Sequence, residues 1–141
     1  MEENKLNKQP DHSVINSMNV LALAYMGDAV YESAVRKYIL LNRPSLKVNE
    51  LHKQAIRYVK ASSQAKAMLD MLHSDFLTEK ETSVVKRARN HSANTPKNAD
   101  VSDYRYATGL EALIGYVHLM GEKQRRHELI KKSIEVINQE R

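Results

Sequence analysis

Apolar residues recur along this chain at the three- and four-residue spacing of helices, and no stretch alternates apolar and polar residues as a strand would. The pattern predicts helices over about residues 17–41, 48–73, 78–89, 100–121 and 122–138. The second of these helices should be interrupted near Ser62 and Ser63. Amphipathic helices without strands bury their apolar faces against one another, so we expect an all-α fold, a compact helical bundle.

Local signals place the ends of these helices. The first helix should stop before Pro44, because the residue that precedes a proline disfavours the helical conformation. Thr78 and Glu81 have the Thr-x-x-Glu spacing of a capping box, which predicts a helix start at this point. Residues 90–99 are rich in turn-forming side chains and are expected to form a loop. Residues 1–15 are expected to be a flexible segment, which leaves residues 16–141 as one folded domain.

Two carboxylates stand among apolar and small residues on different predicted helices. Asp28 follows Gly27 at the border of the first apolar stripe. Glu111 lies on the face of its helix opposite the expected core stripe, with Gly115 one turn later. Burying a carboxylate costs free energy unless the group is paired, hydrogen-bonded or bound to a metal. Each acid alone is compatible with a structural salt bridge or cap, but the two together favour a shared cation site.

The chemistry of the donors and the charge of the chain point to a divalent ion acting on a polyanion. Carboxylate oxygens suit Mg²⁺, for which Mn²⁺ can substitute, and an ion-bound water can attack phosphorus. The chain has no cysteine, which excludes thiolate sites and disulfides, and its net charge of +5 favours a polyanionic partner. No apolar run approaches the roughly 20 residues of a membrane span, and the polar start lacks a signal peptide, so we expect a cytoplasmic location.

The segments around both acids resemble those of a known family. Residues 24–30, Ala-Tyr-Met-Gly-Asp-Ala-Val, resemble the signature segment of the ribonuclease III catalytic domain, and residues 110–115, Leu-Glu-Ala-Leu-Ile-Gly, resemble its second acidic segment. The resemblance spans about residues 18–137. Three further segments resemble the Mini-ribonuclease III subfamily in particular, which lacks a double-stranded-RNA-binding domain: residues 86–90, 95–98 and 103–108.

This resemblance implies the ribonuclease III type of helical bundle, acting as a symmetric homodimer that cleaves double-stranded RNA with Mg²⁺ and leaves 5′-phosphate ends. It implies Asp28 and Glu111 as the catalytic and metal-binding residues. Ribonuclease III has four metal-associated carboxylates, but two of these positions are Ala24 and Thr108 here, as in the subfamily. The number of ions therefore stays open. The implied substrate is the bacterial 23S ribosomal RNA precursor, and a ribosomal protein is left open as an accessory partner.

Basic and amide side chains gather in and around the predicted loop, where they can reach phosphates and 2′-hydroxyls. We expect RNA contacts from Lys86, Arg87, Arg89, Asn90, Lys97 and Asn98. A basic row in the second helical region is a weaker candidate, because any solvated helix face has that spacing. Three other residues, near the acids, are expected to orient a carboxylate or a water: Tyr104, Thr108 and Tyr31.

Two other functions stay open at this point. The first is a catalytically inactive double-stranded-RNA-binding module, in which the loss of acids at positions 24 and 108 has abolished turnover. The second is a helical interaction protein in which Asp28 has a structural role. Products that depend on Mg²⁺ and carry short 3′ overhangs would distinguish the endoribonuclease from both.

Overall fold

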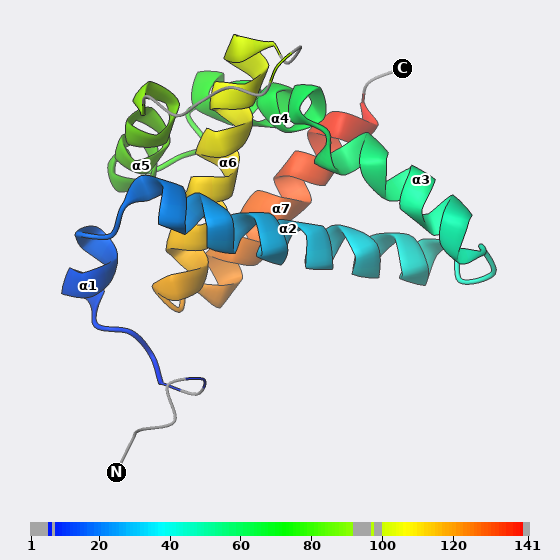
Figure 1. The fold of residues 1–141 in the computed structure, drawn as a ribbon, viewed down its shortest axis with the longest axis horizontal. Coiled ribbons are helices and arrows are strands. Elements are labelled where there is room, and N and C mark those ends of the chain that lie inside the picture. The colour runs from blue at the N-terminus through cyan, green and yellow to red at the C-terminus, as the bar shows by residue number, and fades with distance from the viewer. Residues whose placement is uncertain (1–5, 7, 92–96, 98–99, 140–141) are drawn as a thin grey trace.

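The computed structural model describes residues 6, 8–91, 97 and 100–139, and the regular secondary structure of these residues is entirely helical (Figure 1). This confirms the predicted all-α class. In chain order the helices are α1 (His12–Asn16), α2 (Val20–Asn42), α3 (Val48–Val59), α4 (Ala61–His73), α5 (Glu79–Asn90), α6 (Val101–Leu119) and α7 (Lys123–Asn138).

Helix α6 is the centre of the bundle, and α2, α4, α5 and α7 pack around it (Figure 1). Its expected core positions Leu110 and Leu113 are fully buried, but so are residues on the face predicted to point away from the core, such as Thr108 and Gly115. A helix with small or apolar residues on all sides can be buried on all sides. The prediction of a single core face for this helix was therefore too narrow.

The crossing of α2 over α6 brings two backbones together at glycines (Figure 1). A Cβ atom added to Gly27 would lie 1.7 Å from the carbonyl oxygen of Glu111, and one added to Gly115 would lie 1.9 Å from that of Leu23. Backbone atoms cannot move aside as the end of a side chain can, so a larger residue at either position would push the helices apart. This requirement explains two mid-helix glycines that otherwise weaken helix formation by about 1 kcal/mol each.

The second predicted helix is in fact two helices, which are separated at Lys60. Lys60 has an extended backbone with φ −65° and ψ 150°, two residues before the expected interruption. Side chains satisfy the backbone acceptors that the end of α3 leaves open. The three hydrogen bonds run from Ser63 Oγ to the Arg57 carbonyl (2.6 Å), from the Tyr31 hydroxyl to the Tyr58 carbonyl (2.9 Å), and from Gln64 Nε2 to the Val59 carbonyl (2.8 Å).

The segment expected to be flexible contains a short helix, α1. Its N-cap is Asp11, whose side chain accepts a hydrogen bond of 2.8 Å from the Ser13 backbone N–H. The helix directs Ile15 into the core, where this side chain is fully buried. The two apolar residues of this short helix, Val14 and Ile15, are adjacent and so show no helical periodicity, which is why the sequence pattern missed α1. Residues 1–5 and 7 lie outside the described residues.

The other predicted boundaries agree with the structure. Helix α2 ends at Asn42, before Pro44. Thr78 caps α5 and forms the complete capping box with Glu81, with hydrogen bonds of 2.9 and 3.1 Å. Of the predicted loop, Asn90 is the last residue of α5, and residues 92–96, 98 and 99 lie outside the described residues. Among the helices described, none is both long and apolar enough to cross a membrane.

Candidate functional site

The glycine crossing places the two acids that the sequence singled out beside each other. Asp28 follows Gly27 on α2, and the Glu111 carbonyl is the group that packs against Gly27. The carboxyl groups of Asp28 and Glu111 are hydrogen-bonded to each other. The two residues come from distant parts of the chain, so their meeting depends entirely on how α2 and α6 pack.

The electrostatics of the pair centre on Glu111. Burial, and then the negative charge and hydrogen bond of Asp28, raise the pKa of Glu111 to about 8. Glu32, one turn after Asp28, adds a smaller repulsion, whereas a hydrogen bond from Gln64 acts in the opposite direction. At neutral pH the Glu111 carboxyl therefore retains a proton in the absence of a cation, and a cation would take the place of that proton.

The donor atoms of this site fit a hard divalent cation. Within the described part of the chain, no group of three or more His, Cys, Asp or Glu residues is placed to hold a metal ion. Two carboxylates alone match the usual binding of Mg²⁺, which takes one or two protein carboxylates and completes its shell with waters and phosphate oxygens. Burial and, after it, repulsion from Asp28 raise the pKa of Glu111, and a divalent ion would neutralise that repulsion. Asp28 and Glu111 could therefore hold Mg²⁺ or Mn²⁺.

One polar residue of the site was missed by the sequence analysis. Gln64 lies in the first turn of α4 and is only 2% exposed. Its amide nitrogen donates a hydrogen bond to the Val59 carbonyl, and its amide is also hydrogen-bonded to the Glu111 carboxyl. Its Oε1 atom is buried and has no hydrogen-bond partner among the described residues. The only sequence signal is an amide between the small residues Ser63 and Ala65, which does not reveal its neighbour Glu111.

Two of the three residues expected to orient the acids have other partners. The buried Tyr31 hydroxyl donates to the Tyr58 carbonyl at 2.9 Å, and burial raises its pKa, so it stays protonated. The Thr108 hydroxyl donates to the Tyr104 carbonyl at 2.9 Å, within α6. The protons of both hydroxyl groups are thus donated to backbone oxygens, and each oxygen can still accept a hydrogen bond from a water. That these residues orient a carboxylate or a water stays a prediction. Tyr104 is half-buried near the start of α6, and the role of its hydroxyl stays a prediction.

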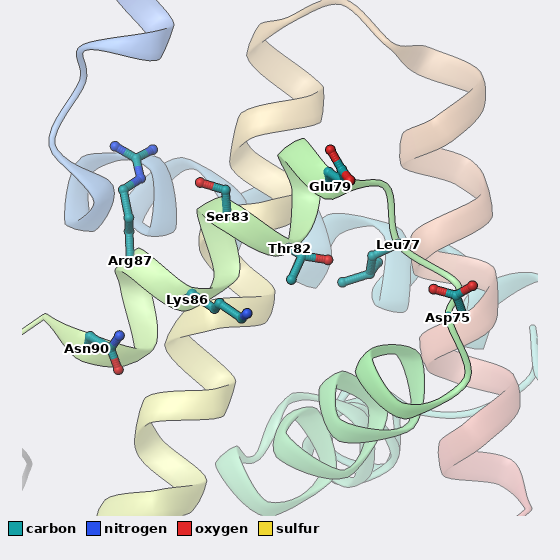
Figure 2. Close-up of a pocket in the computed structure, with 8 residues that line it drawn as sticks. All are labelled: Asp75, Leu77, Glu79, Thr82, Ser83, Lys86, Arg87 and Asn90. Carbon is teal, nitrogen blue, oxygen red and sulfur yellow. The ribbon is translucent and has the colours of Figure 1, made fainter.

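The residues expected to contact RNA lie on α5 and after it. Figure 2 shows the exposed Lys86 and Arg87 leaving α5 in different directions, with Lys86 on the side of Thr82. Together with Asn90 they line an open concavity of about 720 Å³. Its other lining residues are Asp75, Leu77, Glu79, Thr82 and Ser83.

Arg89 differs from these neighbours because its charge already has a partner. It is half-buried, and its guanidinium lies 5.9 Å from the centre of the Tyr106 ring on α6. Its Nε atom is also 3.3 Å from Asn90 Oδ1. Lys97 is exposed, whereas Asn98 lies outside the described residues.

Comparison with known proteins places this arrangement in context. Residues 21–122 match the Ribonuclease III domain. The chain is 47% identical to the Mini-ribonuclease 3 of Enterococcus faecalis over 123 residues, which cover 86% of this chain and 92% of the relative. It is 42% identical to the Mini-ribonuclease 3 of Brevibacillus brevis over 141 residues, 99% of each chain. The crystal structure of a Fusobacterium nucleatum protein, 30% identical, matches with a TM-score of 0.76 over 86% of this chain and 96% of that one.

Proposed function

Since this chain belongs to the ribonuclease III domain family, we propose that it is an endoribonuclease that cleaves double-stranded RNA with a divalent cation held by Asp28 and Glu111. One observation carries the proposal: these two acids meet at the glycine crossing of α2 and α6. The names of the relatives support a ribonuclease, and the acid pair supports the choice of chemistry.

The proposed cation is Mg²⁺. When bound, it would lower the pKa of a water and offset the charge that develops on the scissile phosphate. For the protein, binding requires that Glu111 release the proton it holds near neutral pH. Asp28 is the more exposed acid of the pair and is open to an approaching phosphate. Hydrolysis at this site would leave 5′-phosphate ends.

We propose that the duplex is held by the basic surface of α5 and the residues that follow it. Lys86 and Arg87 are exposed and line the α5 concavity, so their charges are accessible to phosphates. The exposed Lys97 adds a further charge nearby in sequence. Arg89 is proposed to act with its partner Tyr106 rather than as a free charge.

We also propose that the active form is a homodimer in which each protomer cuts one strand. Large apolar side chains on α2 support this: Tyr25 is 84% exposed and Leu41 is 72% exposed. Aromatic residues such as Tyr25 are enriched at protein–protein interfaces. Tyr25 lies one turn before Asp28, so an interface that covers it would lie beside the acid pair. Analytical ultracentrifugation would test the dimer.

The resemblance to the Mini-ribonuclease III subfamily supports one further proposal: a role in maturing the 23S ribosomal RNA precursor in the cytoplasm. A ribosomal protein as an accessory partner stays open. Incubating the purified protein with precursor transcripts and mapping both cleaved ends would test this choice of substrate. Cleavage of a generic duplex with no activity on the precursor would contradict it.

The decisive experiment incubates the protein with long duplex RNA, with and without Mg²⁺. We expect Mg²⁺-dependent cleavage that falls at least about 1,000-fold in Asp28→Asn, while RNA binding changes less than about threefold, because the substitution removes a metal ligand and little else. Glu135→Gln, which alters an exposed acid on α7, serves as the matched control and should cleave normally. Cleavage retained by Asp28→Asn would refute the assignment, and duplex binding without any cleavage by the wild type would favour the inactive RNA-binding module.

A further inference from the structure

We propose that Gln64 is a positioning residue of the acid pair, which holds Glu111 through its amide nitrogen and offers its amide oxygen to a water of the bound cation. The inference rests on the proposed function, because the cation in question is the one assigned to Asp28 and Glu111.

The fold fixes the direction of the Gln64 side chain. Gln64 is in the first turn of α4, immediately after the break at Lys60, and is 2% exposed. Its Nε2 atom donates to the Val59 carbonyl at 2.8 Å, at the end of the preceding helix. A long, flexible amide is thereby held in one orientation before any ligand arrives, which is what a residue that positions another group requires.

The first part of the argument is the contact between Gln64 and Glu111. The amide of Gln64 is hydrogen-bonded to the Glu111 carboxyl, and an amide can offer a carboxylate only its nitrogen as a donor. Gln64 therefore fixes the position of one of the two acids proposed to hold the cation.

The amide oxygen of Gln64 is the second part of the argument. It is buried beside the acids and has no hydrogen-bond partner among the described residues. Buried polar atoms without partners are rare in native folds, because they lose their bonds to water without replacement. The amide cannot be turned over to solve this, since its oxygen would then face the Val59 carbonyl oxygen. A water on a cation donates its protons outward and would satisfy this oxygen.

A purely structural role would require only the bond that Gln64 makes to the end of α3. Ser63 makes the same kind of bond at the same break, from its Oγ atom to the Arg57 carbonyl at 2.6 Å. Ser63→Ala is therefore a matched control, because it removes one such bond and leaves Gln64 unchanged.

The experiment compares Gln64→Met with Ser63→Ala in the absence of RNA. Methionine has a similar length and cannot make either amide hydrogen bond. We expect Gln64→Met to weaken Mn²⁺ binding about tenfold by calorimetry, and to move the titration of the Glu111 carboxyl in the metal-free protein to higher pH by ¹³C NMR. Ser63→Ala should stay within about twofold of wild type in Mn²⁺ affinity. Unchanged Mn²⁺ affinity and an unchanged Glu111 titration in Gln64→Met would overturn the proposal.

Gln64→Glu provides a second variant that keeps an oxygen acceptor and loses the amide donor. At pH 8.5 we expect it to bind Mn²⁺ at least as tightly as wild type, with Glu111 again titrating at higher pH when the metal is absent. If Gln64→Met does not fold, this variant decides the role of the oxygen, and a loss of Mn²⁺ affinity in Gln64→Glu counts against it.

A failure of the proposed function would look different. Mn²⁺ binding that survives Asp28→Asn would show that the cation site lies elsewhere and would remove the proposed role of the Gln64 oxygen. The Glu111 titration in metal-free Gln64→Met would still test whether the Gln64 amide contacts Glu111.

Discussion

The crossing of α2 and α6 and the exposed face of α5 hold their charged groups in opposite ways. At the crossing, backbones touch at Gly27 and Gly115, and the acids are pressed together despite their repulsion. On α5, Lys86 and Arg87 project separately from the helix surface (Figure 2). The comparison teaches that the first region depends on exact packing, whereas the second depends on the number of charges. Substitutions in the two regions should therefore fail in different ways.

The largest effect is expected from Gly27→Ala. The new Cβ would lie 1.7 Å from the Glu111 carbonyl oxygen, so the helices must separate, at a cost of about 3 kcal/mol in the free energy of unfolding. Urea denaturation measures this change. Gly109→Ala is the matched control, because its Cβ would meet a Val85 side-chain atom at 3.2 Å, and it should cost less than about 1 kcal/mol. Equal losses of unfolding free energy in the two variants would contradict the conclusion that backbone contact at Gly27 sets the distance between α2 and α6.

The next effect is a pH dependence of stability in the metal-free protein. Because the pKa of Glu111 is raised to about 8, the folded state retains a proton between about pH 4.5 and 8 that the unfolded state has released. Stability should thus decline as pH rises through this window. Glu111→Gln carries no such proton, so its stability relative to wild type should increase by about 1–3 kcal/mol from pH 4 to pH 8.5, measured by urea denaturation with a chelator.

The buried acid Glu81 supplies the control, because its contribution to stability should change with pH in the opposite direction. Burial alone would raise the pKa of Glu81, but hydrogen bonds from Arg125 and Thr78 hold it below the usual value. Two of these bonds join the Arg125 guanidinium to the carboxylate at 2.8 Å each. The stabilisation is present above the unfolded pKa and is lost as pH falls. Glu81→Gln should therefore cost most at neutral pH and least in acid, and a parallel trend in both variants would contradict this account.

The smallest effects are expected on the α5 surface. Lys86→Ala and Arg87→Ala should each weaken duplex binding about threefold and lower the salt slope of binding by about one, because each removes one of the proposed phosphate contacts. The two losses should add in the double variant, and cleavage at saturating RNA should stay unchanged. Fluorescence anisotropy at 50–200 mM salt, a range of about fourfold, measures both quantities. Strongly non-additive losses of duplex affinity would show that the two side chains form one coupled binding site.

The sequence predicts best what depends on near neighbours. The capping box of Thr78 and Glu81 and the end of α2 before Pro44 involve residues a few positions apart, and both were predicted. The pairing of each acid with a glycine is also visible in the sequence, although the crossing that unites them is not. Local pattern thus recovers the helices other than α1 and singles out the two acids.

What escaped prediction depends on contacts between distant residues. The sequence indicates a break near Ser62 and Ser63, but not that Tyr31, on another helix, stabilises it at Lys60. Helix α1 likewise depends on the burial of Ile15 in a core formed by distant residues. The contact of Gln64 with Glu111, far along the chain, could not be read from the sequence either. The backbone partner of the Tyr31 hydroxyl lies on another helix and could likewise be identified only from the fold.

Helix α6 is enclosed on almost all sides by its neighbours, and it carries Glu111. A tilt of its backbone would disturb the contacts with α2, α4, α5 and α7, so we expect any adjustment at the acid pair to come from rotation about side-chain bonds. Under the proposed function, substitutions on the exterior of α5 would then change which RNA is bound without altering the acid pair. Selectivity and chemistry would be free to diverge at different rates.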